Sequence, residues 1–206
     1  MSIIAIDVAI LPPAPVTELA LALSAGLPRE HSKGLRLDAN HLPHITLTQQ
    51  FVESDDLEAV FDRIAAALKG MSPLTLHAPG TVRSREAVWL KIARAEALAR
   101  LHRRLMDTLA PFERPNGDPS AFAGGDARPN DVAWVSRYRE SASFDAYTPH
   151  ITLGHAVSAP AVEPTTFVAT EIAACQLGRF CTCRTVLRRW TLADAATGVS
   201  PSPVVE

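Results

Sequence analysis

Hydrophobic and polar positions alternate along several segments of the chain and recur at helical spacing along others. In the opening segment, residues 3–11, the even-numbered positions from Ile4 to Ile10 are all β-branched and apolar, which predicts a strand that ends at Pro12. Residues 54–68 instead place apolar side chains every three or four positions behind an acidic first turn, which predicts an amphipathic helix. Read in this way, the predicted elements are strands at 3–11, 43–51, 74–82, 87–93, 132–135, 149–153, 165–179 and 181–192, helices at 16–25, 54–68 and 94–109, and a helical turn at 139–144.

The order of these elements predicts an α+β chain that runs twice through a similar sequence of elements. We expect residues 1–192 to form one bilobal domain, because 206 residues with 47% hydrophobic composition can bury a full core. The Pro-, Ser-, Gly- and Ala-rich residues 193–206 are predicted to be a flexible tail. Residues 113–131 hold so many turn formers that they predict a long loop, for which a lid over a cleft and a mobile surface excursion are both open.

A five-residue stretch occurs twice in the chain. Residues 43–47 and 149–153 both read Pro-His-Ile-Thr-Leu, about half the chain apart. Such a repeat arises by accident in only roughly one or two chains per hundred of this length. Each copy predicts a strand in which His44 and Thr46, or His150 and Thr152, share one face.

The polar face of each repeated strand indicates a cleft. In the first copy we expect Thr48 and Gln50 to continue the polar face and Phe51 to join the apolar one. Because a dry interior would leave imidazole and hydroxyl groups without partners, these faces need water or a ligand beside them. Two His-Thr pairs facing each other would frame one polar cleft.

Composition narrows the class of ligand. A net charge of −2 and a pI near 6.4 argue against binding of a long nucleic-acid backbone by bulk electrostatics, but they allow a small phosphate-bearing ligand. No apolar run is long enough to span a bilayer and the first residues lack the pattern of a signal peptide, so we expect a cytoplasmic monomer without a membrane partner. The sequence has three cysteines, Cys175, Cys181 and Cys183. An odd number in a chain with a sizeable core argues against a disulfide framework.

Two imidazoles could carry out phosphodiester chemistry together. At neutral pH one neutral histidine can accept the proton of an attacking water while a protonated one donates a proton to the departing alkoxide. Nucleophile and leaving group lie on opposite sides of phosphorus, so His44 and His150 are expected to flank the phosphate. Thr46 and Thr152 could hydrogen-bond its non-bridging oxygens. This scheme requires no metal and no other cofactor, and it predicts activity in the presence of a chelator.

The two motifs resemble those of the 2H phosphoesterase superfamily, in particular its LigT-like or 2′-5′ RNA ligase-like branch. The stretch from Tyr147 to Gly154 is especially similar to the second family motif. The resemblance implies a bilobal pseudo-twofold fold with two antiparallel sheets lining a central cleft and helices outside. It also implies metal-independent opening of 2′,3′-cyclic phosphates, of RNA ends or nucleotides, to 2′-phosphates, and in some members 2′-5′ RNA ligation. By analogy His150 is the general base and His44 the general acid, although the sequence does not order them.

Other interpretations stay open at this stage. The chain could be a non-catalytic nucleotide-binding module, an ADP-ribose cyclic phosphate phosphodiesterase, or a metal hydrolase using His41, His44 and His155. The two motif histidines could also be satisfied core residues. Tyr147 and Phe122 are candidates for stacking on a nucleobase. The arginines of residues 94–109, together with His102, are expected on the solvated face of their helix.

Overall fold

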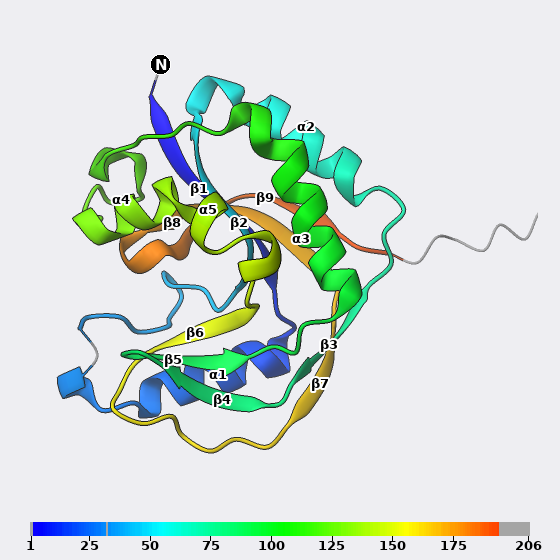
Figure 1. Ribbon diagram of the computed structural model, residues 1–206. Coiled ribbons are helices and arrows are strands. Elements are labelled where there is room, and N and C mark those ends of the chain that lie inside the picture. The colour runs from blue at the N-terminus through cyan, green and yellow to red at the C-terminus, as the bar shows by residue number, and fades with distance from the viewer. Residues whose placement is uncertain (1, 32, 194–206) are drawn as a thin grey trace, which may run out of the picture.

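The fold is a mixed arrangement of antiparallel sheets and helices, seen in a computed structural model that describes residues 2–31 and 33–193 (Figure 1). Most of the predicted tail, residues 194–206, lies outside the described residues. The strands are β1 Ile3–Leu11, β2 Ile45–Glu53, β3 Leu74–Ala78, β4 Gly80–Ser84, β5 Ala87–Lys91, β6 His150–His155, β7 Thr165–Ala169, β8 Glu171–Gly178 and β9 Thr182–Thr191. The α-helices are α1 Ala14–Gly26, α2 Leu57–Leu68, α3 Glu96–Leu109, α4 Pro129–Ser136 and α5 Tyr138–Ser141, and short 3₁₀ turns include 54–56, 119–121, 144–146 and 179–181.

The strands form three antiparallel sheets. The largest is a four-stranded sheet in the order β2-β1-β8-β9, which joins the two ends of the described chain. A three-stranded sheet has the order β4-β5-β6, and β3 pairs with β7 in a two-stranded ladder. The first repeated motif therefore lies at the edge of one sheet, in β2, and the second lies at the edge of another, in β6.

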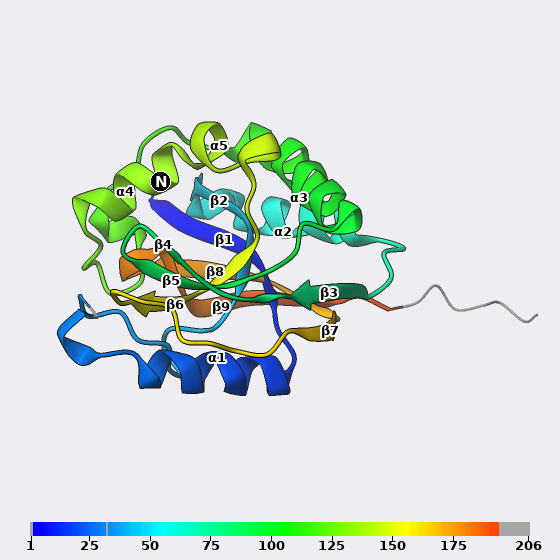
Figure 2. The ribbon, with the colours of Figure 1, turned by 60° about the horizontal axis from the view of Figure 1, so that its bottom comes forward.

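Helices cover the strands from two sides. Figure 2 shows α1 beneath the strands and α2, α3, α4 and α5 above them. Helix α2 packs against α3, and α3 packs on β2, whereas α1 contacts β6. Of the even-numbered side chains of β1, Ile6, Val8 and Ile10 are fully buried in the main core and Ile4 is partly buried against it, in agreement with the predicted alternation. None of the helices among the described residues has the length and apolar run that crossing a bilayer requires.

Both motif strands carry a bulge at the same motif position. Opposite β1, the register passes from Thr48 to Thr46 and leaves Leu47 without a partner. Opposite β5, it passes from Gly154 to Thr152 and leaves Leu153 without one. The two copies are therefore alike in structure as well as in sequence, because each His-Thr pair is followed by one extra residue that bends its strand.

The bulge after Thr46 overturns the predicted polar face of the first motif strand. Beyond the bulge the side chains exchange faces, so Thr48 and Gln50 are buried and Gln49 reaches the cavity that His44 and Thr46 line. Phe51 is fully buried, as predicted, but in a second apolar cluster on the other face of the sheet from Ile6 and Val8.

Several predicted elements differ in the structure. Residues 132–135 belong to helix α4 instead of a strand, because Pro129 opens a helical turn in which Arg128 and Asp131 form reciprocal capping contacts. Residues 74–82 and 165–179 each divide into two strands that join different sheets. The predicted loop at 113–131 is packed over part of its length, since Phe122 is 2% exposed beside Phe51.

Candidate active site

The two motifs meet at one cavity of about 460 Å³. Strands β2 and β6 contact each other, and the cavity is lined by all four motif side chains, His44, Thr46, His150 and Thr152. The expected convergence of the two His-Thr pairs is thus present. A single phosphate-bearing ligand in this cavity would contact side chains from both halves of the chain.

Each motif histidine has its tautomer set by the chain just before it. Nδ1 of His44 donates to the carbonyl oxygen of Leu42 over 2.7 Å, and Nδ1 of His150 donates to that of Thr148 over 2.7 Å. A carbonyl can only accept, so Nδ1 carries the hydrogen in both rings. In both histidines this leaves Nε2 as the nitrogen that can exchange a proton.

His150 is held as a neutral imidazole. Its ring stacks on Trp89, with the ring centres 3.8 Å apart and the planes 18° apart. Burial lowers the pKa of His150 from its usual 6.5 to about 4; the hydrogen bond to Thr148 opposes the shift and the nearby His44 adds to it. At neutral pH this ring can therefore accept a proton but has none to give from Nε2.

His44 faces a buried carboxylate that the sequence analysis did not single out. Nε2 of His44 lies 3.7 Å from Oδ2 of Asp7, a fully buried residue of β1. Asp7 Oδ2 also accepts hydrogen bonds from Thr46 at 2.7 Å and from Gln49 at 2.8 Å, whereas its Oδ1 has no partner among the described residues. Burial raises the pKa of Asp7, although His44, Gln49 and Thr46 each act in the opposite direction.

The two motif threonines have different surroundings. The Thr46 hydroxyl donates to Asp7, so its proton is already in use. The Thr152 hydroxyl, by contrast, makes no hydrogen bond to any residue in the described part of the chain and lines the cavity. Thr152 is therefore the hydroxyl that can donate to a bound anion without breaking an existing contact.

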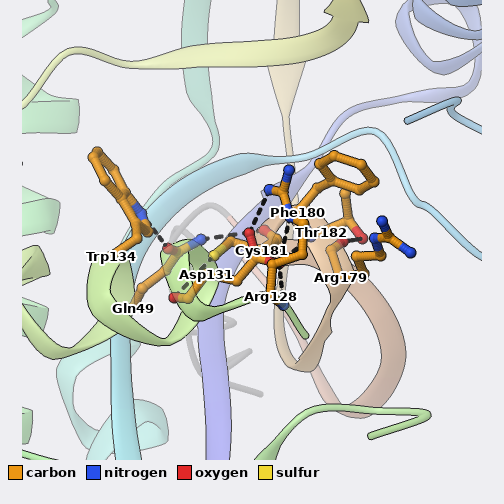
Figure 3. Close-up of polar contacts among 8 residues, drawn as sticks. All are labelled: Gln49, Arg128, Asp131, Trp134, Arg179, Phe180, Cys181 and Thr182. Carbon is orange, nitrogen blue, oxygen red and sulfur yellow. Dashed lines mark hydrogen bonds and ion pairs between the residues drawn. The ribbon is translucent and has the colours of Figure 1, made fainter. Parts of the chain in front are cut away.

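Residues of α4 and of the turn before β9 also line the cavity, and Figure 3 shows polar contacts among several of them. The indole N–H of Trp134 donates to Gln49 at 2.8 Å, and the same Gln49 donates to Asp7. Asp131 accepts from the backbone N–H groups of Arg128 at 2.9 Å and Phe180 at 3.1 Å. Burial opposes ionisation of Asp131, but these bonds and the Arg128 side chain outweigh it and hold its pKa below the usual range.

The two predicted stacking residues have different fates. Tyr147 lines the cavity, but its hydroxyl donates to the carbonyl of Thr46 at 2.9 Å and its ring stacks on His102 with the centres 3.9 Å apart. Phe122 lies in the apolar cluster with Phe51 and does not line the cavity, so its proposed stacking on a base is wrong. The sequence analysis missed other aromatic residues that line the cavity, among them Trp89, which stacks on His150, and Trp134, which is 44% exposed.

His102 was expected on the solvated face of its helix and is instead 1% exposed. Its Nδ1 donates to the carbonyl of Leu47 at 2.6 Å, and its Nε2 accepts from the backbone N–H of Phe144 at 2.8 Å. Burial lowers the pKa of His102, which suits a neutral ring with one donor and one acceptor nitrogen. The arginines of α3 are exposed, as predicted.

The metal site predicted as an alternative from three histidines does not assemble among the described residues. His41 bonds to Asp38 at 2.9 Å, and neither it nor His155 belongs to a described cluster of three side chains with metal-ligand spacing. The side chains that do have such spacing are Asp7, His44 and Cys183, whose ligand atoms lie within 4.8 Å of one another.

Solved structures share this fold. The chain is similar to E. coli LigT in its apo form, with 20% identity, 94% of this chain and 100% of that chain covered, and a TM-score of 0.60. E. coli LigT complexed with NADP⁺ gives 21% identity over 94% and 100% of the chains and a TM-score of 0.62. The protein TT0787 of Thermus thermophilus gives 16% identity over 93% and 99% and a TM-score of 0.56. At these identities the likeness establishes the fold.

The sequence comparisons establish the family. No curated protein sequence matches the chain. A sequence model of the 2′-5′ RNA ligase superfamily does match, over residues 12–180, which include both His-Thr motifs. The resemblance to LigT-like 2H phosphoesterases, inferred above from the motifs, is thereby confirmed. The chain belongs to the 2′-5′ RNA ligase superfamily.

Proposed function

We propose that the protein opens 2′,3′-cyclic phosphates of nucleotides or short RNA ends to 2′-phosphates by acid and base catalysis at its two motif histidines. The observation that carries this proposal is the pair of imidazoles on one cavity, each with Nδ1 committed to a backbone carbonyl and Nε2 left for chemistry. The mild acidity of the chain favours small substrates over long RNA.

His150 is the general base in this proposal and His44 the general acid. Neutral His150 takes a proton from water through Nε2 as the water oxygen forms a bond to phosphorus. The bond from phosphorus to the 3′ oxygen breaks, and His44, which enters the reaction protonated in this proposal and faces Asp7, donates its Nε2 proton to that oxygen. The products are a 2′-phosphomonoester and a free 3′ hydroxyl. In ligation an RNA 5′ hydroxyl takes the place of the water, the same bond to the 3′ oxygen breaks, and the two histidines keep these roles.

Charge that develops on the non-bridging oxygens needs a donor. The unpartnered Thr152 hydroxyl is the first candidate, and Thr46 joins it only when its hydroxyl turns away from Asp7. The nucleobase of the substrate is proposed to lie toward Trp134 and Tyr147. No step draws on a metal or an organic cofactor, and the proposal includes a monomer acting in the cytoplasm.

The test is turnover by the purified full chain in EDTA. Substrates are 2′,3′-cyclic mononucleotides, 2′-5′ dinucleotides and ADP-ribose 1″,2″-cyclic phosphate, with the position of the product phosphate identified by NMR. We expect the 2′-phosphate, and a loss of ~10²–10⁴-fold in kcat/KM for His44→Gln and for His150→Gln. His77→Gln, at an exposed histidine of β3, is the matched control. Near-normal turnover in both motif variants would defeat the proposal.

Two alternatives have distinct outcomes in the same screen. Exclusive turnover of the ADP-ribose compound would make the protein an ADP-ribose cyclic phosphate phosphodiesterase with the same histidine roles. Nucleotide binding in calorimetry with no turnover of any cyclic phosphate would identify a non-catalytic binding module. The free Nε2 atoms of both histidines favour turnover.

A further inference from the structure

One buried oxygen of β1 lacks a partner, next to the residues that line the cavity. Asp7 is fully buried, and its Oδ1 has no hydrogen-bond partner among the described residues, whereas its Oδ2 accepts two hydrogen bonds from Thr46 and Gln49. A buried carboxylate oxygen without a partner is costly and points to a missing ligand. Asp7 also forms a group of three potential metal ligands with His44 and Cys183.

We propose that Asp7, His44 and Cys183 form an inhibitory binding site for Zn²⁺ or a similar thiophilic divalent cation. Carboxylate, imidazole and thiolate are the ligand types of three-ligand zinc sites, in which a fourth position is left for water or another small ligand. With a thiolate and a carboxylate, the bound cation has its charge of +2 balanced inside the protein. Of the three side chains, His44 is the one that lines the cavity.

The geometry is close to what zinc needs. Bonds of ~2.0–2.3 Å place the ligand atoms of a tetrahedral zinc site about 3.3–3.6 Å apart. Here Nε2 of His44 lies 3.7 Å from Oδ2 of Asp7, the oxygen bonded to the same carboxyl carbon as the unpartnered Oδ1. One ligand atom from each of the three side chains lies within 4.8 Å of the others, so the three would have to move closer together around a bound cation. Burial holds the Cys183 thiol protonated by raising its pKa, so the cation must displace that proton to solvent.

The groups that orient metal ligands are already in place. Metal-binding histidines usually donate their other ring N–H to a carbonyl or carboxylate, and Nδ1 of His44 does so to Leu42. Metal-binding carboxylates are usually hydrogen-bonded as well, and Asp7 Oδ2 accepts from Thr46 and Gln49. These contacts leave His44 Nε2 and Asp7 Oδ1 as the atoms available to a cation.

Inhibition follows from the use of His44. A cation on Nε2 occupies the lone pair that carries the proton in the proposed reaction, so the general acid is lost while the metal is bound. This consequence rests on the proposed function, whereas the binding of the metal does not. The site therefore predicts an enzyme that works in chelator and stops when free zinc rises.

The experiment uses the full chain stripped with EDTA and has two independent readouts. Added Co²⁺ is expected to give a thiolate-to-cobalt charge-transfer absorption, and added Zn²⁺ to abolish that absorption and to inhibit turnover. In Cys183→Ala the absorption is expected to vanish and inhibition by Zn²⁺ to weaken by at least ~10–100-fold, since loss of even an outer contact to a metal ligand costs that much. Basal turnover of Cys183→Ala in EDTA is expected to match the unmodified chain.

Controls separate this site from others. Cys181→Ala alters a cysteine outside the group of three and is expected to keep both the absorption and the inhibition. If Cys183→Ala does not fold, His44→Gln is expected to lose the absorption in its place. A cobalt spectrum of the unmodified chain without a sulfur band, or zinc inhibition that Cys183→Ala leaves unchanged, would overturn the proposal. The cobalt readout stands even if no substrate is turned over, so the two proposals fail separately.

Discussion

Removing the indole that stacks on His150 should move the acid limb of the pH profile. In the structure Trp89 covers one face of the imidazole with the ring centres 3.8 Å apart, and burial lowers the pKa of His150 to about 4. Trp89→Leu opens this face to water, so we expect the pKa to rise toward the usual 6.5. The shift is at most the difference between these two values.

The size of the effect at one pH follows from these limits. A base must be deprotonated to act, so activity is retained above its pKa and lost below it. At pH 5 a base of pKa about 4 is roughly 90% neutral, whereas one of pKa 6.5 is only about 3% neutral. Relative to its own plateau near pH 8, Trp89→Leu should therefore lose up to ~30-fold at pH 5, where the unmodified chain loses almost nothing.

The assay is kcat/KM for a 2′,3′-cyclic mononucleotide from pH 4 to 9 in EDTA, because this parameter reports the ionisation of the free enzyme. Trp190→Leu is the matched control, since Trp190, a residue of β9, packs against Phe61 of α2 and does not line the cavity. Its acid limb should coincide with that of the unmodified chain. A limb near pH 6.5 in the unmodified chain, or an unchanged limb in Trp89→Leu, would refute the assignment of His150 as a buried neutral base.

Four further substitutions test other parts of the structure. Thr152→Val should lower kcat/KM by ~10²-fold with little change in Tm, because its hydroxyl has no partner in the described chain. Thr46→Val should in addition lower the free energy of unfolding by ~1–3 kcal/mol, because it removes a hydrogen-bond donor to Asp7; kinetics and calorimetry on both variants test this, and equal Tm values would contradict it. Phe122→Ala should cost ~3–5 kcal/mol in the free energy of unfolding in urea and leave kcat/KM within ~3-fold at low temperature, and intact stability with weak substrate binding would restore its role in stacking. Tyr147→Phe should lower Tm in calorimetry by ~2–6 °C through loss of its bond to the Thr46 carbonyl, and an unchanged Tm would show that this contact contributes nothing.

The sequence predicted the convergence of the motifs because alternation is a local property. His44 and Thr46 are two residues apart before the bulge, so their shared face follows from strand geometry alone. Gln49 lies beyond the bulge, and no local signal in the sequence shows that Leu47 loses its partner there. The same bulge turns Thr48 and Gln50 away from the polar face on which the sequence analysis had placed them.

Asp7 and Trp134 were missed for different reasons. Asp7 is the one charged residue in an otherwise apolar segment, and that contrast could have marked it as a buried acid with a partner in the site. Trp134 lies in Val-Ala-Trp-Val, a run typical of strands, whereas Pro129 and the cap formed with Asp131 determine a helix. The division of residues 165–179 between two sheets depends on pairing with β3 and β1, which are distant in sequence.

The hydrogen bond from each motif imidazole to the carbonyl two residues earlier fixes the histidine tautomer within three consecutive residues. A tripeptide with proline at its centre, Leu42-Pro43-His44 or Thr148-Pro149-His150, sets the proton-exchanging nitrogen without help from the rest of the fold. The surrounding framework is then free to diverge, provided that it keeps two strand edges opposed. This offers a physical reason why the two halves of the chain share so little beyond five letters, and why the same fold can be built at about one-fifth identity.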